Sequence, residues 1–425
     1  MHRTRAIAII ALACVTASGK ADDMADEKPR VVIMTDSGTV YRGYVRSEHP
    51  DVQDLHDMVE QFHRGGVDTF SHCVHARWQT YYDSKVVEIA GDLTPDAVQP
   101  WQHTHYWAWL KTMRRLIEQG HDPPRVLAEA CHERGMRFLA LFRMNDTHGI
   151  HAHEGQYGSF RREYPQWVID GSKSMDYGVP EVRRHILSVV EELVERYKID
   201  GVDFDFMRYP RYFAKGKVKA SASVMTEFLR DVRAILDDPG RPRERRLLLN
   251  VRVPMTIDGC GEIGLDVRSW VKLGLIDMIC PMEFYYSNWD RMIVAIDDWR
   301  DLVESTDCGL YPTIHYGAAT GRGGGYNQPW LTAASYRGAA HSYRLKGADG
   351  IALYNLWNMN NPPAWEAVKD MRDPAALRAG RVDTTVTWAT SFPSRRMSAS
   401  RCRSSCPKIP RHRIAMRTCV FSLPI

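Results

Sequence analysis

The 425-residue chain lacks the short motifs by which many proteins hold metals and nucleotides. Its nine cysteines are scattered, and none forms a CxxC pair or a Cys/His group with the spacing of a zinc site. The first predicted strand leads into MTDSGTVYRGY, which contains no glycine-rich phosphate loop. The sequence therefore predicts no metal site and no cofactor, and it favours free thiols over a disulfide framework.

Long apolar segments and a basic surface are also missing from the main part of the chain. Beyond the N-terminus, no segment has the roughly 18 uninterrupted apolar residues of a membrane helix. The formal net charge of +4 is unevenly distributed, because residues 376–425 carry about +9 and leave about −5 elsewhere. We therefore predict neither a transmembrane segment nor nucleic-acid binding by the main domain.

The two ends of the chain differ from its centre. The start, MHRTRAIAIIALACVTASGKADD, has basic residues, a short apolar run and then small residues, as secretory signal peptides do. We assign residues 1–22 to a signal peptide, which predicts an exported protein that is periplasmic or extracellular. Cys14 in the sequence LAC offers a lipid-anchored form as the alternative.

The C-terminal residues 375–425 are rich in Ser, Arg and Pro and show no periodicity. This composition predicts a disordered basic tail, with a surface-attachment tail or a shifted reading frame as alternatives. Between the two ends, residues 28–374 are predicted to form one domain.

Apolar β-branched runs alternate with helical patterns through this domain. The predicted strands span residues 31–34, 67–74, 136–143, 201–205, 247–252, 276–281, 309–314 and 350–354. The predicted helices span 52–64, 105–119, 124–134, 180–197, 223–236, 266–273, 289–303 and 332–346. Eight short strands that alternate with helices predict an α/β fold of the (β/α)8 TIM-barrel type, with a doubly wound open sheet as the rival.

The fourth predicted strand, within DGVDFDFMRYP, carries two aspartates. Alternation sends its apolar residues toward the helices and turns Asp203 and Asp205 into the barrel mouth. Two carboxylates this close resist ionising together, so each needs a partner, and Arg208 is the candidate for Asp205. We predict a functional role for Asp205. For Asp203 the alternative to a functional role is that of a buried anchor for the neighbouring strands.

The sixth predicted strand ends in ICPMEFYY and places Glu283 directly after a buried segment. An apolar, aromatic setting raises the pKa of a glutamate, which suits a general acid. A salt bridge to an arginine of a neighbouring loop is the alternative.

Polar and aromatic residues follow nearly every predicted strand, which is typical of a ligand cleft at the carboxyl ends of a barrel. HxxH on a strand puts its two imidazoles on opposite sides, so substrate hydrogen bonding is predicted for this pair over metal binding. The predicted substrate-binding residues are Arg208, His72, His75, Arg77, Trp78, Asn145, Asp146, Arg252, Tyr285, His315, Trp357 and Asn358.

The run MDYGVPEVRRHILSVVEELVERYKIDGVDFDFMRYP resembles the glycosyl-hydrolase-like family 10, in which a YGNPEVR helix entry leads to a VDGIxxDxxRYP strand. Asp205 and the triplet Arg208-Tyr-Pro match that pattern. The segments GLDVRSWVKLGLIDMICPM and GADGIALYNLW are similar to the same family, so the resemblance extends over about residues 30–370. The DGxDxDxE signature of family 18 chitinases fits less well, because Met207 stands at its catalytic glutamate.

The resemblance implies an exported (β/α)8 glycoside hydrolase that cleaves O-glycosidic bonds of a polysaccharide or glycan. Asp205 would be the base, nucleophile or charge stabiliser, and Glu283 the proton donor. Asp203 would join Arg208 in setting the pKa of Asp205. The family commonly shows Gln before the aromatic residue of the sixth strand, where this chain has Met282-Glu283, so Glu283 is either an added acid or an exchanged substrate contact.

Aromatic side chains would stack on sugar faces at Trp78, Tyr285 and Trp357.

Two other functions remain as alternatives. One is a carbohydrate-binding barrel without catalysis, because a fold does not guarantee chemistry. The other is a metal-dependent hydrolase that would use His72 and His75 with the two aspartates.

Overall fold

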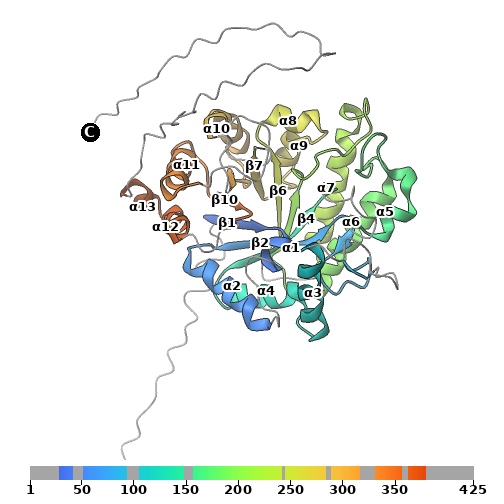
Figure 1. The fold of residues 1–425 in the computed structure, drawn as a ribbon. Helices are drawn as coiled ribbons and strands as arrows, with labels where there is room; N and C mark the ends of the chain where they lie inside the picture. Colours follow the sequence, from blue (N-terminus) through green and yellow to red (C-terminus); the bar gives the residue numbers. More distant parts are fainter. Residues whose placement is uncertain are drawn as a thin grey trace, which may run out of the picture. The chain divides into compact units, whose positions relative to one another are not determined.

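The structure, a computed structural model, describes residues 28–41, 51–92, 105–147, 157–241, 245–283, 289–315, 331–356 and 362–379. The predicted signal peptide and nearly all of the predicted tail lie outside these ranges. The described residues form a ring of strands with helices around it (Figure 1).

Parallel strands make up the wall of a cylinder. They are β1 (Val31–Thr35), β2 (Thr69–Ala76), β4 (Arg137–Arg143), β5 (Gly201–Asp205), β6 (Leu248–Pro254), β7 (Met278–Met282) and β10 (Ile351–Tyr354). Each pairs in parallel with the next one around the wall, and β10 pairs with β1. All are fully or almost fully buried, which explains their continuous apolar character.

One interrupted segment completes the cylinder. Its first part, β8 (Gly309–Leu310), pairs with β7, and its second part, β9 (Thr313–His315), pairs with β10. Only Tyr311 and Pro312 separate the two parts, so this segment joins the two sides of the wall. The predicted eight-stranded α/β barrel is therefore confirmed, with strand boundaries within about two residues of those expected.

Helices cover the outer face of the cylinder (Figure 1). The longer ones are α2 (Val52–Arg64), α3 (His105–Glu118), α4 (Pro123–His132), α6 (Pro180–Arg196), α7 (Ala222–Leu236), α10 (Trp289–Val303), α11 (Ala333–Leu345) and α12 (Pro362–Met371). The shorter ones are α1 (Ser37–Thr39), α5 (Ser159–Glu163), η6 (Pro165–Trp167), η7 (Lys219–Ser221), α8 (Ile257–Glu262), α9 (Val267–Lys272) and α13 (Pro374–Ala379). The helices after β10 were not expected from the sequence.

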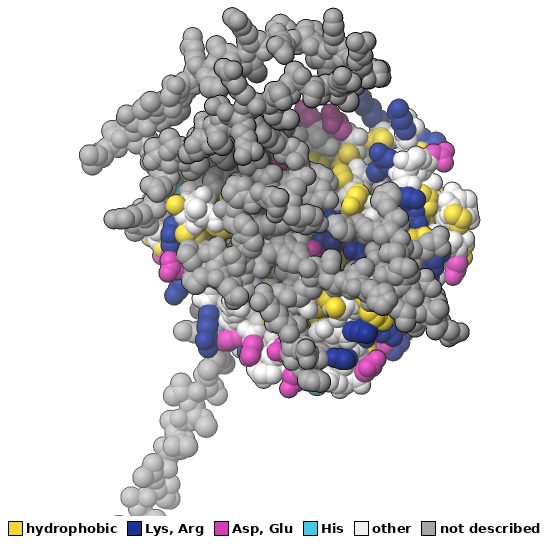
Figure 2. All heavy atoms as spheres, viewed as in Figure 1, with side chains coloured by type: hydrophobic (Ala, Val, Ile, Leu, Met, Phe, Trp, Pro, Cys, Tyr) yellow, Lys and Arg dark blue, Asp and Glu magenta, His cyan; other side chains and the backbone are white. Residues whose placement is uncertain are grey.

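Apolar side chains at helical spacing explain how the outer helices pack. In α2, Leu55, Met58, Val59 and Phe62 are buried and form one stripe toward the strands. Within the described ranges, no helix combines the length and the apolar character that crossing a membrane requires. Both signs of charge are interspersed on the described part of the face drawn in Figure 2.

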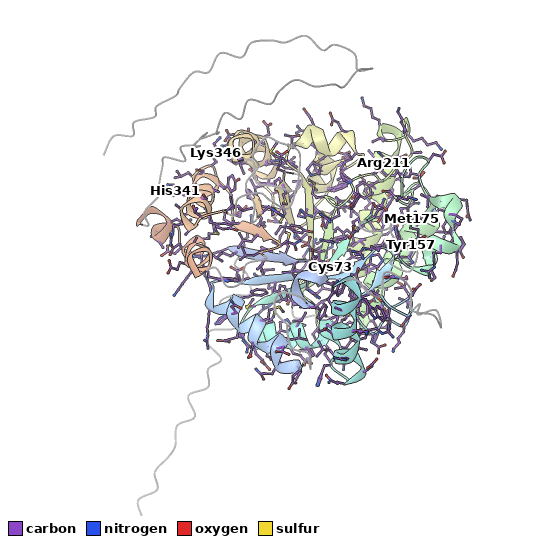
Figure 3. The ribbon with its side chains drawn as sticks, viewed as in Figure 1. Cys73, Tyr157, Met175, Arg211, His341 and Lys346 are labelled. Carbon is purple, nitrogen blue, oxygen red and sulfur yellow. The ribbon has the colours of Figure 1, made fainter. Side chains whose placement is uncertain are left out.

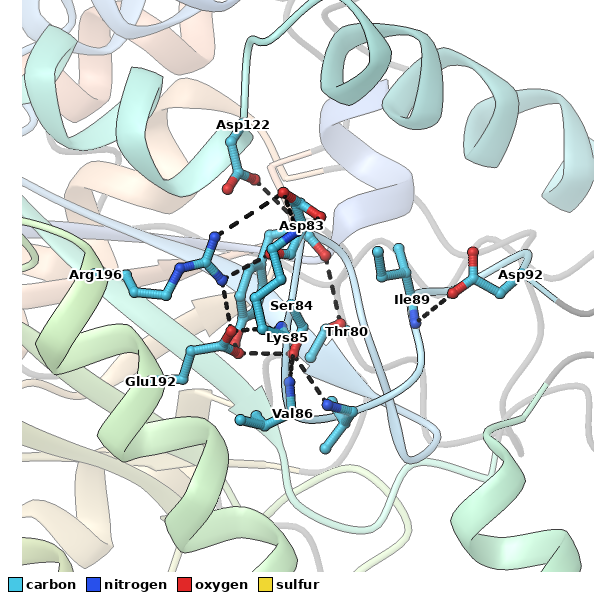
Figure 4. Close-up of polar contacts among 12 residues, drawn as sticks. Thr80, Asp83, Ser84, Lys85, Val86, Ile89, Asp92, Asp122, Glu192 and Arg196 are labelled. Carbon is cyan, nitrogen blue, oxygen red and sulfur yellow. Dashed lines mark hydrogen bonds and ion pairs between the residues drawn. The ribbon is translucent and has the colours of Figure 1, made fainter.

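The connection after β2 is attached to α6 by a buried carboxylate. Glu192 accepts hydrogen bonds from the Tyr82 hydroxyl (2.7 Å), the Ser84 hydroxyl (2.6 Å) and the Lys85 backbone N–H (2.6 Å). Arg196, one turn along α6, contributes a fourth contact at 2.5 Å (Figure 4). Because a buried carboxylate is costly without partners, these four donors account for its place under the segment.

Five cysteines lie in the described residues, and all are buried and free, as the scattered pattern predicted. They are Cys73, Cys131, Cys260, Cys280 and Cys308.

Candidate active site

The carboxyl ends of β5 and β6 hold an ion pair inside the cylinder. Asp205 and Arg252 stand at the same register, and Arg252 Nη2 donates to Asp205 Oδ2 at 2.5 Å. The other oxygen, Oδ1, accepts the Met207 backbone N–H at 2.8 Å. The side chains are 0% and 2% exposed, so the aspartate is fully buried and its charge is balanced by direct donors.

Tyr354, at the end of β10, lies against this pair. The Arg252 guanidinium carbon is 3.7 Å from the centre of the Tyr354 ring, which is cation–π geometry. The hydroxyl is 3.5 Å from Asp205 Oδ2 and accepts a hydrogen bond of 2.7 Å from Arg143 Nη2. Burial raises the pKa of Tyr354 to about 12, so the phenol keeps its proton at neutral pH.

Arg143, at the end of β4, extends the network to two more aspartates. Its Nη2 donates to Asp36 Oδ2 at 2.9 Å, and its Nη1 donates to Asp146 Oδ2 at 3.0 Å. Asn355 also donates to Asp36 Oδ2, at 2.8 Å, from a residue with φ of 48°. Asp36 directly follows β1, so the network draws on β1, β4, β5, β6 and β10.

Asp203 lies two residues before Asp205 on the same face of β5, deeper in the cylinder. Its Oδ2 accepts the Ser71 hydroxyl at 2.6 Å. Ser71 belongs to β2, and β4 stands between β2 and β5, so this bond crosses the interior. Burial, opposed by the Ser71 bond, raises the pKa of Asp203 to about 6. Its contacts resemble those of the buried anchor that the sequence offered as an alternative.

The partner of Asp205 differs from the predicted one. The sequence favoured Arg208, three residues along the same chain segment, whereas the structure pairs Asp205 with Arg252 of the neighbouring strand. Arg208 is partly buried, and its positive charge acts on Tyr354 and His315. Side chains at the same register on adjacent strands lie next to each other. Arg208 lies beyond the end of β5 and would have to fold back to reach Asp205, which explains the difference.

A β-bulge in β2 places His72 and His75 differently from the sequence prediction. The pairing of β2 with β4 shifts between Cys73 and His75, so Val74 is an extra residue and alternation restarts. His72 and His75 consequently lie on the same outer face, under the helices, instead of on opposite faces. Contact with a ligand in the barrel mouth is not available to either of them in this arrangement.

The surroundings of the two imidazoles agree with that position. His72 lies 3.3 Å from the Thr35 hydroxyl and packs edge-on against Tyr41. His75 Nε2 is 3.3 Å from Nε2 of His185 in α6. Burial lowers the pKa of His72 to about 3 and that of His75 well below its usual value, so both rings are neutral.

Trp78 is also placed differently from the expected sugar platform. Its side chain is almost fully buried, and it packs on Phe160, Tyr177 and His185 in the outer layer. With Arg77 it forms the turn between β2 and β3 (Gln79–Thr80), and both residues have positive φ. Arg77 Nε lies 4.0 Å from Asp146, so Arg77 joins the inner network.

Asn145 and His315 are buried close to the network. Asn145 bonds the backbones of Met175 (3.0 Å each way) and Arg211 (2.6 Å), so it holds two connections together; Figure 3 labels both of these partners. The ring of His315 stacks on Tyr354 at 6.1 Å, and burial lowers the pKa of His315 to about 3.

Glu283 follows β7 immediately and is partly buried. The register with β6 turns Met278, Cys280 and Met282 inward, and Met282 Sδ lies 2.8 Å from Arg252 Nη1. Continued alternation would turn Glu283 away from the interior, so its approach to the mouth depends on where the strand ends. The predicted residues Tyr285, Trp357 and Asn358 lie outside the described residues.

Sequence reasoning missed Asp36, Arg143 and Asn355 as site residues. Asp36 and Asn355 directly follow strands, which is the signal that was used for other positions. Arg143 was counted within a strand, and only the barrel register shows that it faces the interior.

The inner network does not have the composition of a metal site. Within the described ranges, no group of three or more His, Cys, Asp or Glu residues is arranged to hold an ion. The four ligands of the metal-dependent alternative are divided between the two faces of the wall, because His72 and His75 point outward and Asp203 and Asp205 inward.

Comparisons with known proteins support the resemblance seen in the sequence. Residues 84–227, which include β4, α6 and β5, match the family model described as Glycosyl hydrolase-like 10. Glycosyl hydrolase YngK of Bacillus subtilis is 24% identical over 314 residues, which cover 64% of this chain and 59% of that protein. Glycosyl hydrolase DigH of Escherichia coli K12 is 24% identical over 270 residues, covering 53% and 59%. The chain thus spans 59% of the length of each of these two relatives, which is less than two thirds.

A solved structure shows the same fold. The PgaB (BpsB) glycoside hydrolase domain from Bordetella bronchiseptica aligns with a TM-score of 0.54 at 12% identity, covering 81% of this chain and 98% of that domain. At this identity the likeness concerns the arrangement of strands and helices.

Proposed function

We propose that this protein is an exported glycoside hydrolase that cleaves O-glycosidic bonds of a polysaccharide or glycan. The main support is the group of aspartates held by arginines at the carboxyl rim of a parallel barrel. The strand that carries Asp205 lies inside the segment that matches the glycosyl hydrolase-like family model. The N-terminal sequence is the support for export.

Hydrolysis of an acetal requires a proton on the leaving oxygen and negative charge near the oxocarbenium ion. Asp205 suits the second task as a charge stabiliser, because Arg252 and the Met207 N–H keep its carboxylate fixed. Both of its oxygens are engaged and its side chain is not exposed, which disfavours the nucleophile role among the three expected from the sequence. Glu283 remains our candidate proton donor.

One observation favours a second candidate function. The complete burial of Asp205 is also what a structural ion pair would show, and a barrel that binds glycans without cleaving them needs no exposed carboxylate. Cleavage and binding must therefore be measured separately.

Conversion of Asp205 to Asn tests the proposal. We expect Asp205→Asn to lower turnover at least about a hundredfold on whichever substrate is cleaved, because the fixed charge is lost. Glu283→Gln should lose most on substrates with poor leaving groups and least on activated aryl glycosides, since these need little protonation. The assay is release of reducing sugar or aglycone from a panel of polysaccharides and aryl glycosides.

Asp277→Asn is the matched control. Asp277 is also paired with arginines, at 2.7 Å from Arg233 and 3.0 Å from Arg246, but it precedes β7 at the opposite end of the barrel. It should lower stability without lowering turnover per folded molecule. Unchanged turnover in Asp205→Asn would remove Asp205 from the mechanism. Glycan binding without any cleavage by the unmodified protein would favour the binding barrel.

A further inference from the structure

We infer that Asp36 is the carboxylate that contacts the substrate and activates the attacking water. This inference rests on the proposed hydrolase function and assigns to Asp36 a role that the sequence gave to Asp205. Asp36 stands directly after β1, at the same rim of the barrel as the other aspartates. Its side chain is 15% exposed, whereas those of Asp146 and Asp205 are 0% exposed. Of these three aspartates, only Asp36 reaches solvent.

Three contacts limit the separation of Asp36 and Asp205. Asp36 Oδ2 to Arg143 is 2.9 Å, Arg143 to the Tyr354 hydroxyl is 2.7 Å, and that hydroxyl to Asp205 Oδ2 is 3.5 Å, so the two carboxylate oxygens are at most about 9 Å apart. The two aspartates therefore border the same part of the barrel rim, with Asp36 on its solvent side.

The partners of Asp36 fit a base better than a proton donor. Its Oδ2 accepts from the Arg143 guanidinium and from the Asn355 amide, and donors of this kind stabilise the ionised carboxylate. An ionised carboxylate that reaches solvent can take a proton from water. Asp205, fully buried beside it, supplies fixed negative charge.

The resulting step uses one base, one acid and one water molecule. Water gives a proton to Asp36 while its oxygen bonds to the anomeric carbon, and the bond from that carbon to the leaving oxygen breaks. The leaving oxygen takes a proton from the donor, which is Glu283 in the proposed mechanism. Asp36 then releases its proton to solvent, and the donor is protonated again.

Asp146 provides a matched comparison within the same network. It contacts the same arginine at 3.0 Å, through Nη1 instead of Nη2, but its side chain is fully buried. If Asp36 only held Arg143 in place, substitutions at the two aspartates would have the same effect. A role in contact with the substrate predicts a difference between them.

Azide rescue separates the two cases. On an activated aryl glycoside of the sugar that the protein cleaves, Asp36→Ala should lose at least about a hundredfold in kcat. Added azide should restore part of the rate and yield a glycosyl azide of inverted anomeric configuration, identified by proton NMR, and the unmodified protein should itself release a sugar of inverted configuration, since a retained one would make Asp36 a nucleophile. Asp146→Ala should show no azide product. Absence of the azide product from a folded Asp36→Ala protein, or equal behaviour of the two variants, would overturn the inference.

If the alanine variant does not fold, Asp36→Asn replaces it in the rate measurement. If the proposed hydrolase function fails, glycan binding is measured instead of cleavage. If the unmodified protein binds a glycan without cleaving it, Asp36→Asn should weaken that binding about tenfold, whereas the control Asp277→Asn at the opposite end of the barrel should not. Equal dissociation constants would overturn the Asp36 contact while the binding function stands. A protein that neither cleaves nor binds any glycan of the panel would overturn both proposals.

Discussion

At the scale of single residues, two aspartates on one strand face have opposite environments. Asp205 has an arginine and a backbone N–H as partners, which stabilise its charge. Asp203, two residues earlier, has a serine hydroxyl, which compensates burial only in part. Removing one member of a buried ion pair costs about 3–5 kcal/mol because the remaining charge is left unpaired, so we expect loss of either Asp205 or Arg252 alone to destabilise the fold. The same strand face therefore carries one carboxyl group in an ion pair and one whose pKa is raised by burial to about 6.

The raised pKa of Asp203 predicts a pH dependence of stability. Below about pH 4 the carboxyl is neutral in both states, and above that the unfolded chain loses its proton first. Folding therefore becomes less favourable as the pH rises, until the folded pKa of about 6 is passed. A shift from 3.8 to about 6 corresponds to about 3 kcal/mol.

Asp203→Asn removes this titration. We expect its free energy of unfolding, relative to the unmodified protein, to rise by about 2 to 3 kcal/mol between pH 4 and pH 7, measured by urea unfolding. Comparing the two proteins at each pH cancels the other titrating groups. An unchanged difference across this range would show that Asp203 is not the group that titrates.

At the scale of elements, the sequence predicted which strands exist better than it predicted which way their side chains face. All eight strands were predicted because each is a buried apolar run between helical patterns. The facing of Asp203 and Asp205 followed from regular alternation in β5. The same rule failed in β2, because a bulge depends on pairing with β4 and leaves no sign in the sequence of β2 itself. Arg252 was likewise recognised as polar, but its partner depended on register.

Gly201, the first residue of β5, shows how close neighbouring strands approach. A Cβ at this position would lie 2.1 Å from the Leu248 carbonyl oxygen of β6. We expect Gly201→Ala to lower the free energy of unfolding by at least about 2 kcal/mol, because backbone must move on both strands. Gly261→Ala in α8 is the control, since nothing lies within 4 Å of its added methyl group. It should be neutral or stabilise by up to about 1 kcal/mol in the same denaturation assay. A Gly201→Ala protein as stable as the control would contradict the close approach of β5 and β6.

At the scale of the whole molecule, closure of the barrel depends on one segment. Residues 309–315 pair on one side with β7 and on the other with β10, and Tyr311 stands at the change of partner. The sequence indicated a single strand here, because the alternation of side chains along a strand does not show that its pairing partner changes from β7 to β10. Tyr311 is fully buried, and in the described structure its hydroxyl has no hydrogen-bond partner. Its ring is close to Gly309 and Gly350, where an added Cβ would lie 2.6 and 2.5 Å away.

Substitution of Tyr311 tests this closure. Tyr311→Ala would leave a cavity between β7 and β10, and we expect a loss of about 3–5 kcal/mol in the free energy of unfolding. Tyr311→Phe keeps the ring and removes an unsatisfied buried hydroxyl, so its stability should equal the unmodified protein or exceed it by about 1 kcal/mol. Urea unfolding followed by circular dichroism and by tryptophan fluorescence gives both values, and coincident transitions would show that the barrel unfolds as one unit. Because Tyr311 lies near Asp68, Arg137 and Asp349 at the amino ends of the strands, turnover per folded molecule should be unchanged in both variants. An alanine variant as stable as the phenylalanine variant would mean that this ring does not fill the join between β7 and β10.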